Sequence, residues 1–157
     1  MLATDVGVAP AAHPDTIGSD PDLMTRLEQI RRAGATRMGI DPETQSIPKI
    51  VLLSPPTAAE QAGGVHIVCR ALSMQQAHRA VPLTLALNLG ASCSLPGTLP
   101  ARIAVGAEGE RSITIAHASG RLEVGSVVDG EGKVESALLH RTARVMMTGD
   151  VFYTVEE

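Results

Sequence analysis

The chain has 157 residues, a formal net charge of −4, 44% apolar residues and 19% charged residues, a composition typical of a globular domain and not of a disordered chain. The acidic balance and the near absence of aromatic residues argue against a nucleic-acid-binding surface. The longest apolar stretch, residues 80–89, is interrupted by polar residues and is too short for a membrane span, which takes about 20 residues. Cys69 and Cys93 are expected to be buried thiols in a reducing environment, and no spacing indicates a metal site. We therefore expect a cytoplasmic protein that binds no membrane, nucleic acid or metal.

The first part of the chain predicts one amphipathic helix. Residues 1–18 hold several Pro and Gly residues and show no period, so we expect an irregular N-terminal segment. Asp20 can cap a helix, and Pro21 is tolerated in its first turn. Leu23, Leu27 and Ile30 then fall on one face. This pattern predicts an outer helix over 21–38.

The middle of the chain predicts two strands and an apolar helix. The strands are expected at 49–53 and 65–70, on either side of a turn that contains Pro55-Pro56. Ser73 is interpreted as the N-cap of a second helix over about 74–90, with Pro82 as a kink and Gly90 as its end. The later part of this helix is apolar almost all round, which is typical of a helix at the centre of a core.

The rest of the chain predicts strands at 102–105, 112–116, 121–128, 134–139 and 143–147, with a last strand that carries Phe152 and Tyr153. Asp129-Gly130 between two alternating runs predicts a hairpin. The expected fold is a single α+β domain over 1–157. Its curved antiparallel sheet would be wrapped around the apolar helix, with the first helix outside.

Three places could bind anions. Ser73 and Met74 would lie at a helix N-terminus, with Arg70 and His78 adding positive charge; the alternative is a plain capping serine. Ser119-Gly120 at a strand end could form a nest of amides; the alternative is a hairpin turn. A further pair, Arg141 and Arg144, could bind a polycarboxylate or merely line a basic strand face. No serine or cysteine has a base at a spacing that predicts a nucleophile.

Six segments in this order resemble the second half of the PrpF family of isomerases. They are 27–31 with 38–40, 48–50 before the Pro55-Pro56 turn, 70–74 with His78, 95–98, 115–120 and 141–144. Gln75 stands where a Gly is common in the family.

The resemblance implies a fold similar to diaminopimelate epimerase, in which two similar halves enclose the active site. It implies isomerisation of unsaturated di- and tricarboxylates by proton transfer without a metal or organic cofactor. It also implies that the lysine and cysteine that move the proton lie in the N-terminal half, which has no counterpart here. Ser73, Met74, His78, Ser119 and Gly120 would then bind substrate carboxylates at the cleft, and no residue of this chain is assigned a catalytic role.

Two hypotheses follow for the function of the chain. In the first, the chain is a half-enzyme that is inactive alone: a shortened polypeptide, a gene fragment, or one subunit of a split isomerase whose partner supplies the missing half. In the second, it is a homodimeric carboxylate-binding or interaction domain without catalysis, because an isolated half would expose an apolar face that drives association. A hydrolase that uses Ser73 or Ser119 is disfavoured, because no base is positioned.

Overall fold

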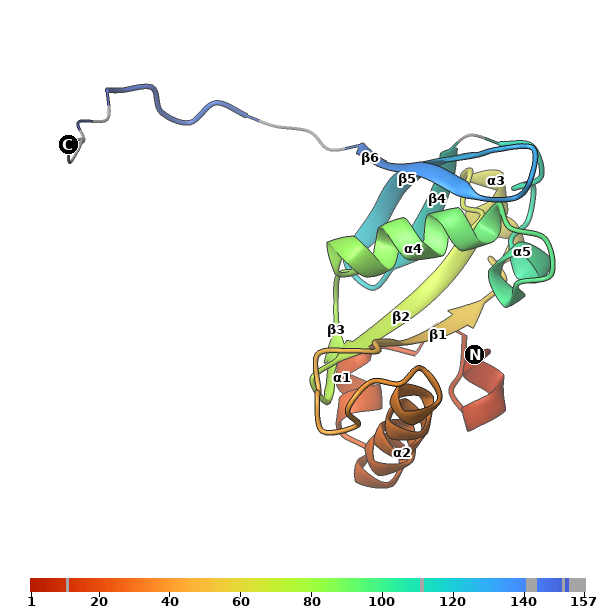
Figure 1. Cartoon of the computed structure of the whole chain (residues 1–157), viewed down its shortest axis with the longest axis vertical. Helices are drawn as coiled ribbons and strands as arrows, with labels where there is room; N and C mark the ends of the chain where they lie inside the picture. Colours follow the sequence, from red (N-terminus) through yellow and green to blue (C-terminus); the bar gives the residue numbers. More distant parts are fainter. Residues whose placement is uncertain (11, 111, 141–143, 151, 153–157) are drawn as a thin grey trace.

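The computed structural model describes residues 1–10, 12–110, 112–140, 144–150 and 152 as an α+β fold (Figure 1). The helices are η1 (Ala3–Val6), α1 (Pro14–Gly18), α2 (Pro21–Arg37), α3 (Ala58–Ala62), α4 (Leu83–Cys93) and α5 (Leu99–Ile103). The strands are β1 (Ile50–Ser54), β2 (Ile67–Ser73), β3 (Gln76–His78), β4 (Ser112–His117), β5 (Gly120–Val128) and β6 (Val134–His140). None of the described helices is both long and apolar enough to cross a lipid bilayer.

The strands form one six-stranded sheet in the order β1-β2-β4-β5-β6, and β3 pairs with the end of β2. The β2 and β4 strands are parallel, whereas every other pair is antiparallel. The expectation of a purely antiparallel sheet is therefore wrong. The chain passes through β3, α4 and α5 between β2 and β4, and such a crossover lets two strands run in the same direction.

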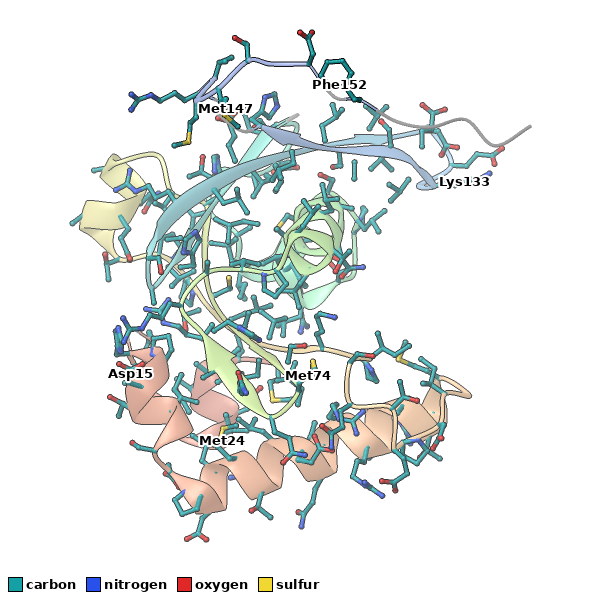
Figure 2. The ribbon with its side chains drawn as sticks, turned by 90° about the vertical axis from the view of Figure 1, so that its left-hand side faces the viewer. Asp15, Met24, Met74, Lys133, Met147 and Phe152 are labelled. Carbon is teal, nitrogen blue, oxygen red and sulfur yellow. The ribbon has the colours of Figure 1, made fainter. Side chains whose placement is uncertain are left out.

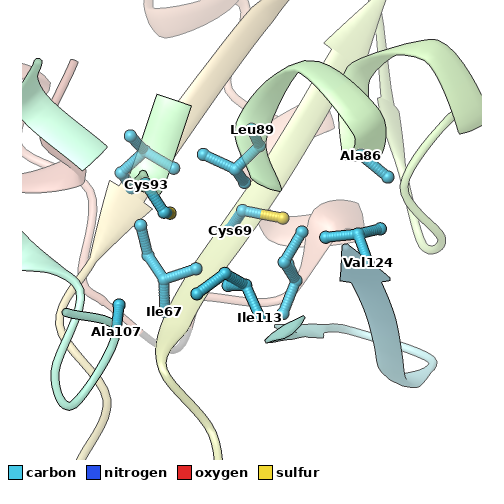
Figure 3. Packing of buried hydrophobic residues seen from close by; sticks show 10 residues of the cluster. Ile67, Cys69, Ala86, Leu89, Cys93, Ala107, Ile113 and Val124 are labelled. Atoms are coloured by element: carbon cyan, nitrogen blue, oxygen red, sulfur yellow. The ribbon is translucent and has the colours of Figure 1, made fainter. Parts of the chain in front are cut away.

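Two apolar clusters hold the helices against the sheet. The α4 helix contributes Ala86, Leu89 and Cys93 to the first cluster, which also contains Ile67 from β2 and Val124 from β5 (Figure 3). The second cluster joins α1 and α2 to β1 and the end of β2, through residues that include Ile17, Leu27, Leu52 and Leu72. The apolar helix thus packs on the sheet as its composition indicates, while the wrapped geometry stays a prediction.

A buried arginine fixes the loop between α2 and β1. Arg31 is only 4% exposed, and its guanidinium donates to both carboxylate oxygens of Glu28. It also donates to the backbone carbonyls of Pro42, Thr44 and Ile47. The hydrogen bond from Arg31 lowers the pKa of the Glu28 carboxyl below its ordinary value. The arginine therefore anchors the entry to β1.

Several predicted elements are confirmed within one or two residues. The outer helix runs over Pro21–Arg37, and Asp20 caps it by accepting from the Leu23 amide at 2.9 Å. The β4, β5 and β6 strands match their expected ranges, and the hairpin at Asp129-Gly130 joins β5 to β6. These elements carry strong local signals, namely a cap, a turn or an alternating pattern.

Other elements differ from the expectation. Residues 1–18 contain η1 and α1 instead of an irregular segment, and His13 caps α1 by accepting from the Asp15 amide at 3.2 Å. Residues 99–103 form a helix and not a strand, because Thr98 caps it and Pro100 fits its first turn. Residues 144–147 and Phe152 are in no strand, whereas residue 143 and Tyr153 lie outside the described residues.

The predicted helix over 74–90 is also wrong. The β2 strand continues to Ser73, and Met74 and Gln75 form a two-residue turn into β3, both with positive φ (51° and 57°). The helix begins only at Leu83, with Pro82 as its N-cap residue. A proline costs little at a helix start and much in a helix interior, so Pro82 marks the start of α4 and not a kink. The α4 helix continues past Gly90 to Cys93.

Candidate functional site

Ser73 and Met74 lie at the tip of the β2–β3 hairpin and not at a helix N-terminus. Ser73 pairs with Gln76 across the turn, and the Met74 side chain is exposed. The tip lies against α2 (Figure 2), where Ser73, Met74, Met24 and Leu27 are among the residues that line a cavity of about 20 Å³. A cavity of that size holds a water molecule and not a carboxylic acid. The helix-dipole argument for an anion site at Ser73 therefore fails.

His78 and the Ser119-Gly120 turn are brought close together. His78 ends β3 and pairs with Ala71. The next residue, Arg79, accepts a hydrogen bond through its backbone carbonyl from the Ser119 amide at 3.0 Å. The structure thus separates the first predicted place: His78 lies beside the Ser119-Gly120 turn, whereas Ser73 and Met74 lie at the hairpin tip.

The turn between β4 and β5 does not present a free nest of amides. The Ser119 amide is used by Arg79, and it also lies 3.2 Å from the Nδ1 atom of His117, which accepts from it. Gly120 has a φ of 141°, which favours glycine at this position. The turn is therefore a hairpin that is tied to the β3–α4 loop, as the alternative interpretation holds.

His117 is the titratable group of the β4–β5 turn with a shifted pKa. Burial lowers the pKa of its imidazole below the ordinary value, and the charge of Arg70 lowers it further, while the backbone of Arg79 acts in the opposite direction. The ring is accordingly neutral at neutral pH. Because Nδ1 accepts from the Ser119 amide, the proton of the neutral ring is assigned to Nε2.

Arg70 and Arg79 bring positive charge to this region. The Arg70 guanidinium is half-buried and donates to the carbonyls of Ala12 and Cys69 at 2.7 and 2.9 Å. The Arg79 guanidinium is exposed and forms a 2.7 Å ion pair with Asp15 of α1. The exposed pair is screened by water, so Arg79 can exchange Asp15 for a ligand carboxylate at small cost.

The first turn of α4 has no side-chain cap, and the sequence interpretation missed this helix start. Pro82 provides no side-chain cap, and the first intrahelical donor is the Ala86 amide, which bonds to the Pro82 carbonyl. The amides of Leu83, Thr84 and Leu85 therefore have no partner within the helix, and they lie at the positive end of its dipole. The position of Pro82 was the signal that could have located this helix start.

These elements meet at one end of the sheet, where α4 begins and β4 turns into β5 (Figure 1). We call this region the corner; it comprises residues 78–79, 83–85 and 117–120. The corner contains the predicted residues His78, Ser119 and Gly120, together with Arg79 and the α4 amides. Its hydrogen-bond donors with no helical or strand partner are the amides of Leu83–Leu85, and its exposed guanidinium, that of Arg79, is paired with Asp15.

A cavity of about 810 Å³ lies at the opposite end of α4. Its lining includes Ser94 and Ser126, whose hydroxyls are 3.0 Å apart, as well as Arg102, Glu108 and Glu110. The C-terminal end of a helix and two glutamates disfavour a carboxylate there. None of the predicted site residues lines this cavity.

The third predicted place, at Arg141 and Arg144, is described only in part. Arg141 is not described, and Arg144 is exposed. No cluster of His, Cys, Asp or Glu in the described part of the chain could hold a metal ion.

Comparison with known proteins decides the family. The PrpF protein family profile matches residues 1–154. The chain belongs to the PrpF family. Its relatives include the 2-methyl-aconitate isomerase of Shewanella oneidensis, 34% identical over 165 aligned positions that cover 95% of this chain and 41% of that protein. The (4E)-oxalomesaconate Delta-isomerase of Novosphingobium sp. is 34% identical over 97% of this chain and 42% of its own length.

A solved structure agrees with this assignment. The crystal structure of a methylitaconate-delta-isomerase superposes with a TM-score of 0.81 at 26% identity, over 93% of this chain and 42% of that chain. The PrpF-family chain described here thus spans about two fifths of the length of the relatives that it matches.

Proposed function

We propose that this PrpF-family chain is the C-terminal, carboxylate-binding half of an isomerase that acts on unsaturated di- or tricarboxylates by cofactor-independent proton transfer. A second polypeptide segment would supply the groups that move the proton, and the chain alone would be inactive. The observation that carries the proposal is the family match over residues 1–154 in a chain that covers only 41–42% of two isomerase relatives. Both relatives are named for isomerisation of aconitate-like acids.

The lysines and cysteines of the chain lie away from the corner, which supports the proposal that the lysine–cysteine pair implied by the resemblance comes from another segment. Cys69 and Cys93 lie in the core, where burial raises the pKa of each thiol to about 12. Lys49 donates to the Ser46 carbonyl in the loop before β1, and Lys133 lies in the β5–β6 hairpin, at the other end of β5 from the corner. These are the two lysines and two cysteines of the chain. None of the four contributes to the corner.

The corner is the proposed place of carboxylate binding. Arg79 would bind one carboxylate in place of Asp15, and the amides of Leu83–Leu85 would donate hydrogen bonds to the carboxylate oxygens. Ser119, Gly120 and His78 would border the ligand. Ser73 and Met74 would contact the substrate only if the acid is long enough to extend from the corner to the hairpin tip, or they would contact a companion segment. The small cavity at the hairpin tip is not lined by any residue of the corner.

Binding is tested by titrating the chain with trans-aconitate and following backbone amide shifts by NMR. We expect the largest shifts at residues 83–85 and 117–120. Arg79→Gln should weaken binding about tenfold, since a charged hydrogen bond at a partly exposed site is worth roughly 1.4 kcal/mol. Arg32→Gln is the matched control, because Arg32 lies on α2 and pairs with Glu43 of the loop that follows α2. Equal loss in both variants, or shifts confined to the hairpin at Ser73, would refute the corner as the site.

A second candidate function is a homodimeric carboxylate-binding or interaction domain without catalysis. Exposed apolar side chains favour this candidate, because contact with a second copy would remove them from water. Leu83 is 53% exposed and Leu138 is 52% exposed. Sedimentation across a wide range of protein concentration distinguishes the two candidates. A monomer at all concentrations would rule out the homodimer.

A further inference from the structure

An ion pair ties the short helix α1 to the loop between β3 and α4. The Nη2 atom of Arg79 donates to Oδ2 of Asp15 at 2.7 Å, although the two residues are 64 positions apart. Asp15 lies in the first turn of α1 (Figure 2), and α1 packs beside β3. Among the described residues, this carboxylate is the only hydrogen-bond partner of the Arg79 side chain. The guanidinium on which the proposed function depends is therefore already occupied by a carboxylate of the chain itself.

The fold holds both partners of this ion pair in place. On one side, Ile17 of α1 is 2% exposed in an apolar cluster, and Arg70 donates to the Ala12 carbonyl, just before α1, at 2.7 Å. On the other side, the backbone carbonyl of Arg79 accepts from the Ser119 amide at 3.0 Å. Because both backbones are anchored, the entropy cost of forming the pair is limited to the ordering of its two side chains.

The contact between Asp15 and Arg79 is weaker than the contact that a ligand carboxylate can make. One nitrogen of the guanidinium donates to Asp15, and one carboxylate oxygen accepts. A guanidinium can donate two parallel hydrogen bonds to one carboxylate, and such bidentate pairs are the stronger ones. The Asp15 and Arg79 side chains are also 63% and 65% exposed, so water screens their attraction. A ligand carboxylate can therefore displace Asp15, but it has to break an existing pair to do so.

We propose that Asp15 is an internal competitor for the carboxylate site at Arg79, an inference that rests on the function proposed above. In the free chain, the Asp15 carboxylate occupies the guanidinium. When an unsaturated acid binds, its carboxylate replaces that of Asp15, and Asp15 turns to water. The contact between α1 and the β3–α4 loop is therefore autoinhibitory, because it lowers the affinity of the corner for the acid without taking part in binding it.

The test is a titration of the chain with trans-aconitate, in which the dissociation constant is obtained from the amide shifts at residues 83–85 and 117–120. Asp15→Asn should lower the dissociation constant about two- to fivefold, the range expected when an exposed ion pair no longer competes. Glu131→Gln is the matched control, because it removes the same charge from the exposed hairpin between β5 and β6. This control should bind trans-aconitate as the unmodified chain does.

A double variant separates competition for Arg79 from a general effect of charge. In the Arg79→Gln background the guanidinium is absent, so Asp15→Asn should lose most of its effect on the dissociation constant. Asp15→Ser removes the same carboxylate with a different side chain and should act in the same direction as Asp15→Asn. Amide spectra that coincide outside α1 and the corner show that the exposed substitutions leave the fold intact.

Three results would overturn the inference. They are a dissociation constant that is unchanged or higher in Asp15→Asn, an equal gain in affinity in Glu131→Gln, and a gain that survives in full without Arg79. A higher dissociation constant would show that Asp15 positions Arg79 for the ligand.

The same titration distinguishes failure of the inference from failure of the proposed function. If the unmodified chain and Asp15→Asn bind trans-aconitate at the corner equally well, the inference fails and the proposed function stands. If neither shows shifts at residues 83–85 and 117–120, the proposed function fails and the inference fails with it.

Discussion

Burial decides the chemistry of the two cysteines. Cys69 lies on β2 and Cys93 on α4, in the same apolar cluster (Figure 3). Burial disfavours the thiolate, and this effect raises the pKa of each thiol to about 12. A thiol that stays protonated in the core is a poor nucleophile and cannot exchange protons with a ligand at neutral pH.

The raised pKa of these thiols predicts slow alkylation. In the folded chain at pH 8, iodoacetamide should modify neither Cys69 nor Cys93 at an appreciable rate, and both should react once the chain is unfolded in urea. Mass spectrometry of the alkylated chain checks this. Rapid native modification of either thiol would show that it is accessible and would reopen its role in proton transfer.

The raised pKa values of the two thiols also predict that the free energy of unfolding falls at high pH. The unfolded thiols ionise near the ordinary value of 9.0, whereas the folded thiols keep their protons to about 12. The stability that these groups contribute is complete below pH 9 and is lost as the pH rises toward 12.

At the level of single residues, the sequence allowed the burial of both cysteines to be predicted from residue type alone. It did not reveal the role of Arg31, because the carbonyls of Pro42, Thr44 and Ile47 meet one guanidinium only after the loop has folded. It did not reveal the contact between Arg79 and Ser119 either, since these residues are 40 positions apart.

The packing of α4 on the sheet depends on Gly90. A Cβ atom at this position would lie 2.4 Å from Cγ2 of Val124 on β5. Gly90 is therefore a contact residue inside the helix and not the helix end that the sequence predicts. In contrast, a Cβ at Gly34 of α2 would meet only Pro48, at 3.8 Å.

This difference predicts opposite effects for two glycine substitutions. Gly90→Ala should lower the free energy of unfolding by about 1–3 kcal/mol through overpacking. Gly34→Ala should raise it by roughly 0.5–1 kcal/mol, because alanine favours the helix and has room there. Urea denaturation measures both. A stabilising Gly90→Ala would contradict the close contact between α4 and β5, and Val124→Ala should relieve the strain of Gly90→Ala if the contact is its cause.

At the level of elements, helices with a side-chain cap and strands beside a recognisable turn were predictable. The error at α4 came from treating Ser73 as a cap, although Ala71 and Leu72 are buried in the sheet and continue β2. A turn formed by Met74 and Gln75 could not be foreseen, because non-glycine residues rarely adopt positive φ. Glycine, which the resemblance leads one to expect at position 75, is the residue best suited to this conformation.

For the whole molecule, the α+β class followed from the alternation of helical and strand patterns. The parallel pairing of β2 with β4 could not be predicted, because it results from the crossover through α4 and α5. The misplaced helix over 74–90 hid the true length of this crossover. The corner is also a property of the whole fold: it joins the β3–α4 loop, the first turn of α4 and the β4–β5 turn. Only the last of these was predicted in its correct local structure, as a hairpin.

The central claim is that the chain binds an unsaturated carboxylate but cannot move its proton. The most direct measurement is proton NMR of trans-aconitate in D₂O with the purified chain, recorded at ligand concentrations that shift the amides of the corner. We predict binding without deuterium incorporation or isomerisation beyond the buffer control, because the corner lacks the lysine–cysteine pair to which the resemblance assigns the proton transfer: both thiols are buried and both lysines lie elsewhere. Deuterium incorporation that depends on the chain, and that Arg79→Gln abolishes, would show a complete active site in this chain and contradict the account.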